Sequence, residues 1–539
     1  MGRIYFKKIN FGFLVLFCMF ALSSIVLGKE NHKSYIPPSS YWLEHVENDL
    51  LPFWMHPSMI NLDDAFFPTF RMECGDPVSS DNRNLYSSIA SMREGDWILD
   101  DIGKNFTRMH ARQTFAYGIA YHLTGNMKYF ELMYKGVLFS INNCFDDYGA
   151  ITTIFSDNPD DNIPENRTSQ DQAYSLTGLA FYYYLTRDEN ILEIILKQHN
   201  YIMKTYGRYN EVDKLVSLTW LPSDKYGDEL VAILDQLNAY MILLAPIIPE
   251  PHASVWKNTI KQICYIMIAD FFVDEVLLHE NTLKVNSFWG NLNEKKIGGK
   301  HFDFGHSIKA WWMIYLAGQM LDDDFLISKG RKGMEALLTI GYVPGELFKK
   351  AALEQGLANP ILGLSNIASW GEKFHYDNTQ WWVNNNVSLN QHWWIHCEMD
   401  QAAATMALME NRFNKELSLT SRFFVEHYVD KLGKEVWHSI DAATLAPKFM
   451  KTHSWKNAYH SFEHALIMAI AGQGCNDQNI TLHFVLSEDV MRFTLLQPYY
   501  FAGKLMNVSY GTIRNEKLQA YNRFSTAVTF KMHSHRNNL

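Results

Sequence analysis

The sequence has few cysteines, six in 539 residues. One lies in the apolar N-terminal run, and the other five are widely spaced and contain no C-x-x-C pair: Cys74, Cys144, Cys264, Cys397 and Cys475. Disulfide-stapled domains carry paired cysteines at short spacing. The pattern therefore excludes a disulfide scaffold, while the odd number still allows one bridge.

Clustered positive charge and glycine-rich phosphate loops are also missing. The formal net charge is −10, and Lys and Arg form no block anywhere in the chain. Phosphate binding needs such clusters, so nucleic acid is excluded as a general partner. No glycine-rich loop follows a predicted strand, which argues against a parallel α/β fold that binds nucleotides.

Aromatic residues, in contrast, are abundant. They make up 14% of the chain, including 15 Trp and 28 Tyr. This content suits a cleft that stacks on flat, amphipathic ligands such as sugar rings, and it equally suits an aromatic helical core.

The N-terminus is typical of an export signal. The basic start MGRIYFKKIN precedes an apolar run that ends in small residues, with a cleavage site at Val26-Leu27-Gly28. We predict that residues 1–28 are removed and that the protein is exported. If the segment stays in place, residues 11–28 are about long enough to anchor the chain in a thin bilayer.

From about residue 40 the chain consists of amphipathic segments separated by short polar turns. Their apolar residues recur at helical spacing. The predicted helices are Met109–Leu123, Gln172–Leu185, Glu229–Pro246, Val255–Val273, Ile308–Leu321 and Met399–Met409. With no strands between them, they indicate stacked or toroidal helix pairs over residues 40–475.

The tail has a different character. Residues 476–539 carry β-branched and aromatic residues in short runs, which predict strands at Ile480–Val485, Phe493–Phe501 and Thr526–Lys531. We expect a small β-rich C-terminal extension.

Four clusters place titratable groups among aromatic residues. They are RMHARQTF (108–115), DFGHSIKAWW (303–312), HWWIHCEM (392–399) and WKNAYH (455–460). A histidine among aromatics is often only a satisfied core residue. Four such clusters are harder to explain that way, because each buried polar group without a partner costs roughly 1–3 kcal/mol.

The clusters, in this order, resemble the N-acylglucosamine 2-epimerase superfamily, which includes cellobiose 2-epimerases and mannose isomerases. The likeness spans roughly residues 50–470 and includes the helix around 170–174. It rests on Trp455-Lys456-x-x-Tyr459-His460, Trp393-Trp394-x-x-x-Glu398, Gly305-His306, and Ala111-Arg112 with Tyr117. It implies an (α/α)6 barrel, in agreement with the helix pairs inferred above.

The resemblance also implies a chemistry. His306 and His460 match the two histidines that move the proton beside a sugar carbonyl through an enediolate, and Arg112 matches the arginine that steadies its oxyanion. Trp394 and Trp455 would stack on the sugar. Glu398 would position a hydroxyl or an acid. The reaction implied is 2-epimerisation or aldose–ketose isomerisation, and it requires no metal or redox cofactor.

Two departures from the family pattern concern the substrate contacts. The family reads G-H-x-x-E, whereas Lys309 follows His306 here, so a possible cation replaces an anion on the same helix face. We therefore expect His306 to be a weaker proton acceptor. Asp235 and Asn238 align where sugar epimerases have His and Glu, so a charged or unusually linked sugar stays open.

Three other functions remain open. The cleft could bind a saccharide without catalysis if Lys309 silences the chemistry. A glycoside hydrolase or lyase would need paired carboxylates, for which Asp171, Asp235 and Glu398 are available.

The third is a zinc peptidase. HSFEH (460–464) matches H-x-x-E-H, with His460 and His464 as ligands, Glu463 as base and Glu488 as a further ligand. His392 and His396 form a second pair at i, i+4. No other motif supports a metal site.

Overall fold

The computed structural model describes residues 36–539 apart from 58–65, 147–148, 156–163, 211–214, 224–227, 279–280, 295–300, 358–366, 375–387, 494, 514–522 and 533–539. The predicted signal peptide, residues 1–28, lies outside these ranges. Among the described helices, none is both long enough and apolar enough to cross a membrane.

The longest apolar helices are buried around almost their whole circumference. A helix without a polar face belongs inside a protein. Six helical segments have this character: α6 (Thr107–Thr124), α8 with α9 (Ser169–Ser175, Thr177–Thr186), α11 with α12 (Leu230–Gln236, Ile242–Leu244), α14 (Phe304–Leu321), α17 (Trp393–Glu410) and α19 (Tyr459–Cys475). A π-helical turn, Leu237–Met241, joins α11 to α12.

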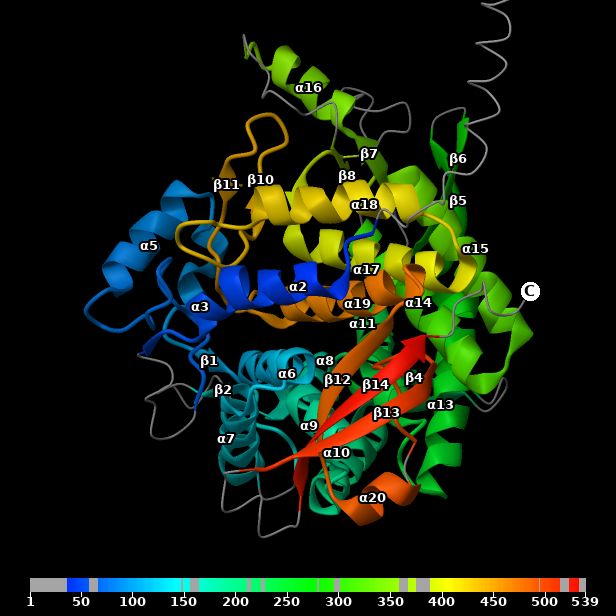
Figure 1. Ribbon diagram of the computed structural model, residues 1–539. Coiled ribbons are helices and arrows are strands. Elements are labelled where there is room, and N and C mark those ends of the chain that lie inside the picture. The colour runs from blue at the N-terminus through cyan, green and yellow to red at the C-terminus, as the bar shows by residue number, and fades with distance from the viewer. Residues whose placement is uncertain are drawn as a thin grey trace, which may run out of the picture. The chain divides into compact units, whose positions relative to one another are not determined.

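Each buried segment packs against a neighbouring helix, and most of these partners have one buried and one exposed face (Figure 1). The partners are α7 (Met127–Asn143), α10 (Glu189–Tyr206), α13 (His252–Ile266), α15 (Asp324–Gly341), α18 (Asn414–Phe423) and α2 (Ser39–His45). Helix pairs therefore dominate the fold, as predicted.

The buried helices also contact one another in chain order. Helix α6 packs on α8 and α9, α8 on α11, α12 on α14, α14 on α17, α17 on α19, and α19 returns to α6. Five of the six predicted helices fall on these segments, and the sixth, Val255–Val273, matches α13 and the π-helical turn Met267–Phe271. The predicted helix Gln172–Leu185 is interrupted at Leu176, between α8 and α9.

Short strands and helices connect the helix pairs. The antiparallel strands are β1 (Asn105–Phe106) with β2 (Ile154–Phe155), β3 (Gly207–Asn210) with β4 (Leu215–Leu218), β5 (Phe272–Leu278) with β6 (Asn281–Phe288), β7 (Tyr342–Pro344) with β8 (Ala368–Trp370), and β9 (Gln391–His392), β10 (Ser439–Ile440) and β11 (Pro447–Lys448). The remaining α-helices are α3 (Leu51–Trp54), α5 (Arg83–Met92), α16 (Gly345–Glu354) and α20 (Glu488–Phe493). Strands β1 and β9 run directly into α6 and α17, so they fix where these two helices begin.

Three longer strands follow α19. Strands β12 (Asn479–Leu486), β14 (Phe524–Met532) and β13 (Gly503–Gly511) lie side by side in that order, all antiparallel, and appear orange to red in Figure 1. β12 packs against α6, α9 and α19. The predicted strands at 480–485 and 526–531 are confirmed, and the division of the chain into domains at residue 476 stays a prediction.

The third predicted strand, Phe493–Phe501, is wrong. Helix α20 ends at Phe493, and the residues after it turn at Pro498. Proline cannot donate to a strand ladder, and Tyr499 has a φ of 57°, outside the extended region. The aromatic residues of this segment indicate burial more than strand structure: Tyr499 and Phe501 are buried, although the backbone around them is irregular.

The five described cysteines are free thiols. The bridge that the sequence allowed does not form among them.

Candidate active site

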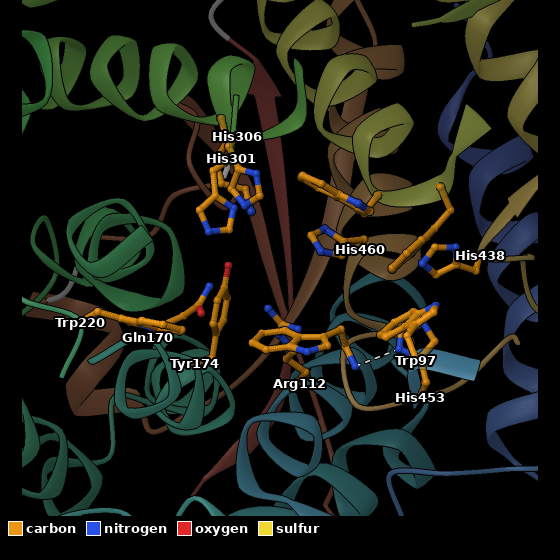
Figure 2. A pocket seen from close by; sticks show the side chains of 14 residues that line it. Trp97, Arg112, Gln170, Tyr174, Trp220, His301, His306, His438, His453 and His460 are labelled. Atoms are coloured by element: carbon orange, nitrogen blue, oxygen red, sulfur yellow. Dashed lines mark hydrogen bonds between the residues drawn. The ribbon is translucent and has the colours of Figure 1, made fainter. Parts of the chain in front are cut away.

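One cavity of about 430 Å³ gathers residues from all four aromatic clusters. Its aromatic walls are Trp97, Tyr174, Trp220, Trp393, Trp394 and Trp455. Five histidines, two cationic side chains and Gln170 complete the lining. Figure 2 shows His301 and His306 at one side, His438, His453 and Trp97 at the other, and His460 and Arg112 between them. Apolar walls with a few convergent polar groups are typical of a small-molecule site.

His306 lies in the first turn of α14, where Asp303 caps the helix. The Asp303 Oδ1 atom accepts from the His306 backbone N–H at 2.8 Å, and Oδ2 lies 2.7 Å from the ring Nδ1. Burial alone would raise the pKa of Asp303, but the His306 imidazole and its hydrogen bonds lower that pKa to about 2. An ionised Asp303 can only accept, so Nδ1 carries the proton and Nε2 is the nitrogen that can exchange one.

His460 lies in the first turn of α19 and is more deeply buried. Its Nδ1 atom lies 3.3 Å from Oε1 of Glu398, on α17. The same oxygen is 2.8 Å from Nζ of Lys309, on α14. Burial lowers the pKa of His460 to about 4, and the Lys309 and Arg112 charges act in the same direction against Glu398. At neutral pH His460 is therefore an uncharged imidazole.

Lys309 forms its ion pair with Glu398, on α17, and the weaker proton affinity expected for His306 stays a prediction. It is buried against Glu398, whose carboxylate raises the pKa of Lys309 against the effect of burial. In turn the pKa of Glu398 is lowered, because Lys309 and His460 outweigh the effect of burial. The carboxylate beside His306 is Asp303, three residues before it instead of three after it. An Asp at a helix N-cap is the signal that could have identified this partner.

Arg112 projects from α6 into the middle of the cavity. Its guanidinium carbon lies 3.8 Å from the ring centroid of Tyr174 and 5.0 Å from that of Tyr459. Its Nε atom is buried without a hydrogen-bond partner, and no carboxylate pairs with Arg112 in the described part of the chain. A buried guanidinium without an anion is costly, so the site suits a ligand that places negative charge there.

The two predicted stacking residues, Trp394 and Trp455, both line the cavity. Trp394 stands against His306, with ring centroids 4.7 Å apart, and 6.2 Å from His460. Its approach depends on Gly305, where an added Cβ would come within 2.3 Å of the indole. Trp455 is 39% exposed and is held by Arg108, whose guanidinium lies 3.8 Å from its ring centroid.

Three predicted substrate contacts lie behind the lining instead of on it: Glu398, Asp235 and Asn238 are buried and do not face the cavity. Asp235 accepts from Gln170 at 2.8 Å and from the Tyr174 hydroxyl at 2.7 Å. Asn238 donates to the Tyr459 hydroxyl at 3.0 Å. Their place behind the wall corrects the expectation of direct contact: Asp235 and Glu398 hold side chains that line the cavity, whereas Asn238 holds Tyr459, which is not part of the lining.

Sequence reasoning missed three histidines of the lining. His301 packs against His306 with ring centroids 4.4 Å apart, and its Nε2 atom lies 3.2 Å from Glu229. His438 and His453 lie 5.0 Å apart at the other end. Burial lowers the pKa of both well below the ordinary value, so this end is uncharged. All three fall outside the four clusters, and only the fold brings them to the cavity.

The residues of the zinc-peptidase motif do not converge on one point. His464 points away from His460, and its Nε2 atom lies 2.9 Å from Asp400. His396 is 3.5 Å from the same Asp400, whereas His392 is 3.6 Å from Glu372. The two i, i+4 pairs therefore serve separate ion and hydrogen-bond networks.

Two other groups of donor atoms lie within 4.8 Å of one another: His301, Asp303 and His306, and Glu398, His460 and Glu463. The first group is engaged internally by the hydrogen bond between Asp303 and His306. In the second, the Lys309 ammonium supplies the cation. The first group is thus held by a hydrogen bond and the second by an ion pair.

The carboxylates available for glycoside hydrolysis are likewise engaged. Asp171 pairs with Arg108 at 2.7 Å, and Asp235 and Glu398 are bound as described above. None of the three lines the cavity. A hydrolase places two carboxyl groups across the scissile bond, and this cavity places two histidines across from each other.

Comparison with known proteins identifies the fold. No protein-family model and no curated protein matches the chain. Among solved structures, cellobiose 2-epimerase from Bacillus thermoamylovorans B4167 matches with a TM-score of 0.57 at 15% identity, covering 80% of this chain and 98% of that one. A sugar epimerase from a ruminal bacterium gives 0.54 at 16% identity, covering 81% and 99%. D-Mannose isomerase gives 0.57 at 10% identity, covering 80% and 97%.

At these identities the likeness concerns the fold. The resemblance predicted from the sequence motifs is confirmed at that level: this chain has the fold of the sugar epimerases and isomerases of the N-acylglucosamine 2-epimerase superfamily.

Proposed function

We propose that the chain is a sugar 2-epimerase or aldose–ketose isomerase built as an (α/α)6 barrel. The observation that carries this proposal is the placement of His306 and His460 in one cavity, from different helices, with the unpaired Arg112 between them. The closed order of contacts among the buried helices supports the barrel.

The two histidines suit opposite roles in a proton transfer. His460, uncharged at neutral pH, can accept the proton from the carbon next to the sugar carbonyl. The electron pair left behind forms an enediolate, and negative charge develops on the carbonyl oxygen. Arg112 is the donor that meets this charge, and its Nε atom is already desolvated.

His306 can then return a proton. Its Nδ1 is held by the ionised Asp303, and a charge-assisted hydrogen bond of this kind stabilises an imidazolium. Proton delivery to C2 from the opposite face gives the 2-epimer, whereas delivery to C1 gives the ketose. The reverse reaction exchanges the two roles.

The cavity walls set the class of substrate. Trp394 and Trp455 offer aromatic faces to a sugar ring, and the cavity of about 430 Å³ is open enough for a mono- or oligosaccharide. We also propose that the protein is exported, and this proposal rests on the N-terminal sequence alone.

Hydrogen exchange in D2O tests the proposal. Purified protein is incubated with cellobiose, mannose and other aldoses, and deuterium at C2 is measured by NMR. We expect the wild type to incorporate deuterium and His460→Gln to incorporate none. His252 is an exposed histidine on α13, so the control variant His252→Gln should incorporate as much as the wild type. No exchange with any aldose, together with sugar binding that His460→Gln does not affect, would favour a binding protein.

The hydrolase alternative has a separate measurement. Epimerisation releases no new reducing ends, so reducing ends released from an oligosaccharide would contradict the proposal and favour hydrolysis.

A further inference from the structure

The segment that follows α20, residues 495–501, reaches the underside of the candidate active site. The Tyr499 hydroxyl donates to Oε1 of Glu463 at 2.6 Å. The Tyr499 backbone N–H donates to the Tyr184 hydroxyl at 2.9 Å, and that hydroxyl donates to the Gln497 carbonyl at 2.6 Å. Hydrogen bonds at Gln497 and Tyr499 thus fix the segment to both α9 and α19.

Glu463 lies one turn after His460 on the same face of α19 and is fully buried. One of its oxygens lies within 4.8 Å of donor atoms of Glu398 and His460. Its Oε2 atom has no hydrogen-bond partner among the described residues. Two carboxylates in such a place cannot both ionise without a large cost, so one of them keeps its proton.

The proton belongs to Glu463. Burial raises the pKa of Glu463 to about 8, and the Glu398 carboxylate adds to this effect. Opposing influences come from the hydrogen bond of Tyr499 and from the charges of Lys309 on α14 and Arg112 on α6. Glu398 has the Lys309 ammonium at 2.8 Å and is the member of the pair that ionises.

A second tyrosine ties the same segment to the other side of His460. The Tyr500 hydroxyl donates to the Asn238 backbone carbonyl at 3.1 Å. The Asn238 side chain donates to the hydroxyl of Tyr459, the residue before His460. Tyr500 also packs edge-on against Trp312, with ring centroids 5.7 Å apart.

We infer that residues 495–501 are part of the active site, and that Tyr499 and Glu463 are positioning residues for His460. Burial beside Glu398 keeps Glu463 a neutral acid, and the hydrogen bond from Tyr499 fixes the orientation of its carboxyl group, so His460 faces a single negative charge instead of two. An uncharged His460 is what the proposed function requires of the base, so the effect on catalysis rests on that proposal. The hydrogen-bonded arrangement of Tyr499 and Glu463 does not depend on the proposed function.

Infrared spectroscopy tests the arrangement without any substrate. A protonated carboxylic acid has a carbonyl band separate from that of a carboxylate, and subtracting the Glu463→Gln spectrum isolates the band of Glu463. We expect the band to persist at pH 7 and to disappear with a midpoint near pH 8. Circular dichroism checks that each variant is folded.

Tyr499→Phe supplies the decisive variant, and it also serves if Glu463→Gln fails to fold. The Tyr499 hydroxyl stabilises the ionised form of Glu463, so its loss should move the midpoint to higher pH. Tyr510→Phe, an exposed tyrosine on β13, should leave it unchanged. A midpoint near 4.5, or one that Tyr499→Phe does not move, overturns the inference.

The pH profile of C2 exchange gives a second readout. Ionisation of Glu463 should produce an alkaline limb near pH 8 that Glu463→Gln removes and Tyr499→Phe shifts upward. An infrared band that behaves as expected in a protein without exchange activity would leave this arrangement standing and remove the proposed function.

Discussion

His306 and His460 face one cavity, but their surroundings differ. His306 is half-buried, and its carboxylate, Asp303, comes from its own helix end. His460 is buried, and its carboxylate, Glu398, is shared with Lys309, so three helices build that side. The first arrangement is local and places an ionised carboxylate on the ring Nδ1 atom. The second depends on tertiary packing and keeps the imidazole neutral. Two histidines that look equivalent in their sequence motifs thus have different surroundings, which suit the separate acid and base roles proposed for them.

The largest expected effects come from removing either imidazole. We expect His306→Gln and His460→Gln each to lower the rate of C2 exchange by roughly 10²- to 10⁴-fold, since each removes a positioned acid or base. The double variant should lose little more than the worse single variant, because the two act in one reaction. Single-turnover exchange in D2O measures this. A variant that retains more than a tenth of the activity would show that its histidine does not transfer the proton.

The next effect concerns the shared carboxylate of His460. Lys309→Met leaves Glu398 buried without its cation, which should cost about 3–5 kcal/mol in the free energy of unfolding. Lys350→Met is the matched control, because its pair with Glu354 is exposed and should contribute less than about 1 kcal/mol. Urea denaturation compares the two. Equal losses of unfolding free energy would mean that the buried pair stabilises the fold no more than the exposed pair.

A smaller effect is expected from Gly305, which lets the Trp394 indole pack beside His306. Gly305→Ala places a methyl group against the indole, and overpacking of this kind costs about 1–3 kcal/mol. The displaced indole should weaken sugar binding measured by tryptophan fluorescence. Gly511→Ala is the control, since an added Cβ there meets its nearest atom at an ordinary 3.6 Å. Unchanged stability and binding in Gly305→Ala would show that the indole can move aside freely.

The contrast also explains how much the sequence could predict. Helical periodicity predicted the positions of the helices. Short motifs identified His306, His460 and Arg112, and these residues share one cavity because each motif lies at the start of a buried helix or within one. The ion-pair partner of Lys309 was not identified, because spacing along one helix reveals only neighbours on that helix, whereas Glu398 is on α17. His301, His438 and Tyr499 were missed, because only tertiary packing brings these loop residues to the site or beneath it.

The smallest expected effect tests the local half of the comparison. Folding lowers the pKa of Asp303 from 3.8 to about 2. A carboxyl with a lowered pKa stabilises the folded state above its unfolded pKa and loses that contribution as the pH falls through the folded value. The shift corresponds to about 2 kcal/mol, at 1.36 kcal/mol per pKa unit.

Asp303→Asn should remove this dependence while keeping the helix cap, since asparagine caps helices as well as aspartate does. We therefore expect the free energy of unfolding of the wild type to fall by about 2 kcal/mol more than that of Asp303→Asn between pH 4 and pH 2. Parallel urea titrations over this range measure the difference. Parallel curves would mean that His306 does not hold Asp303 in its ionised form, and the acid of the proposed pair would lose its partner.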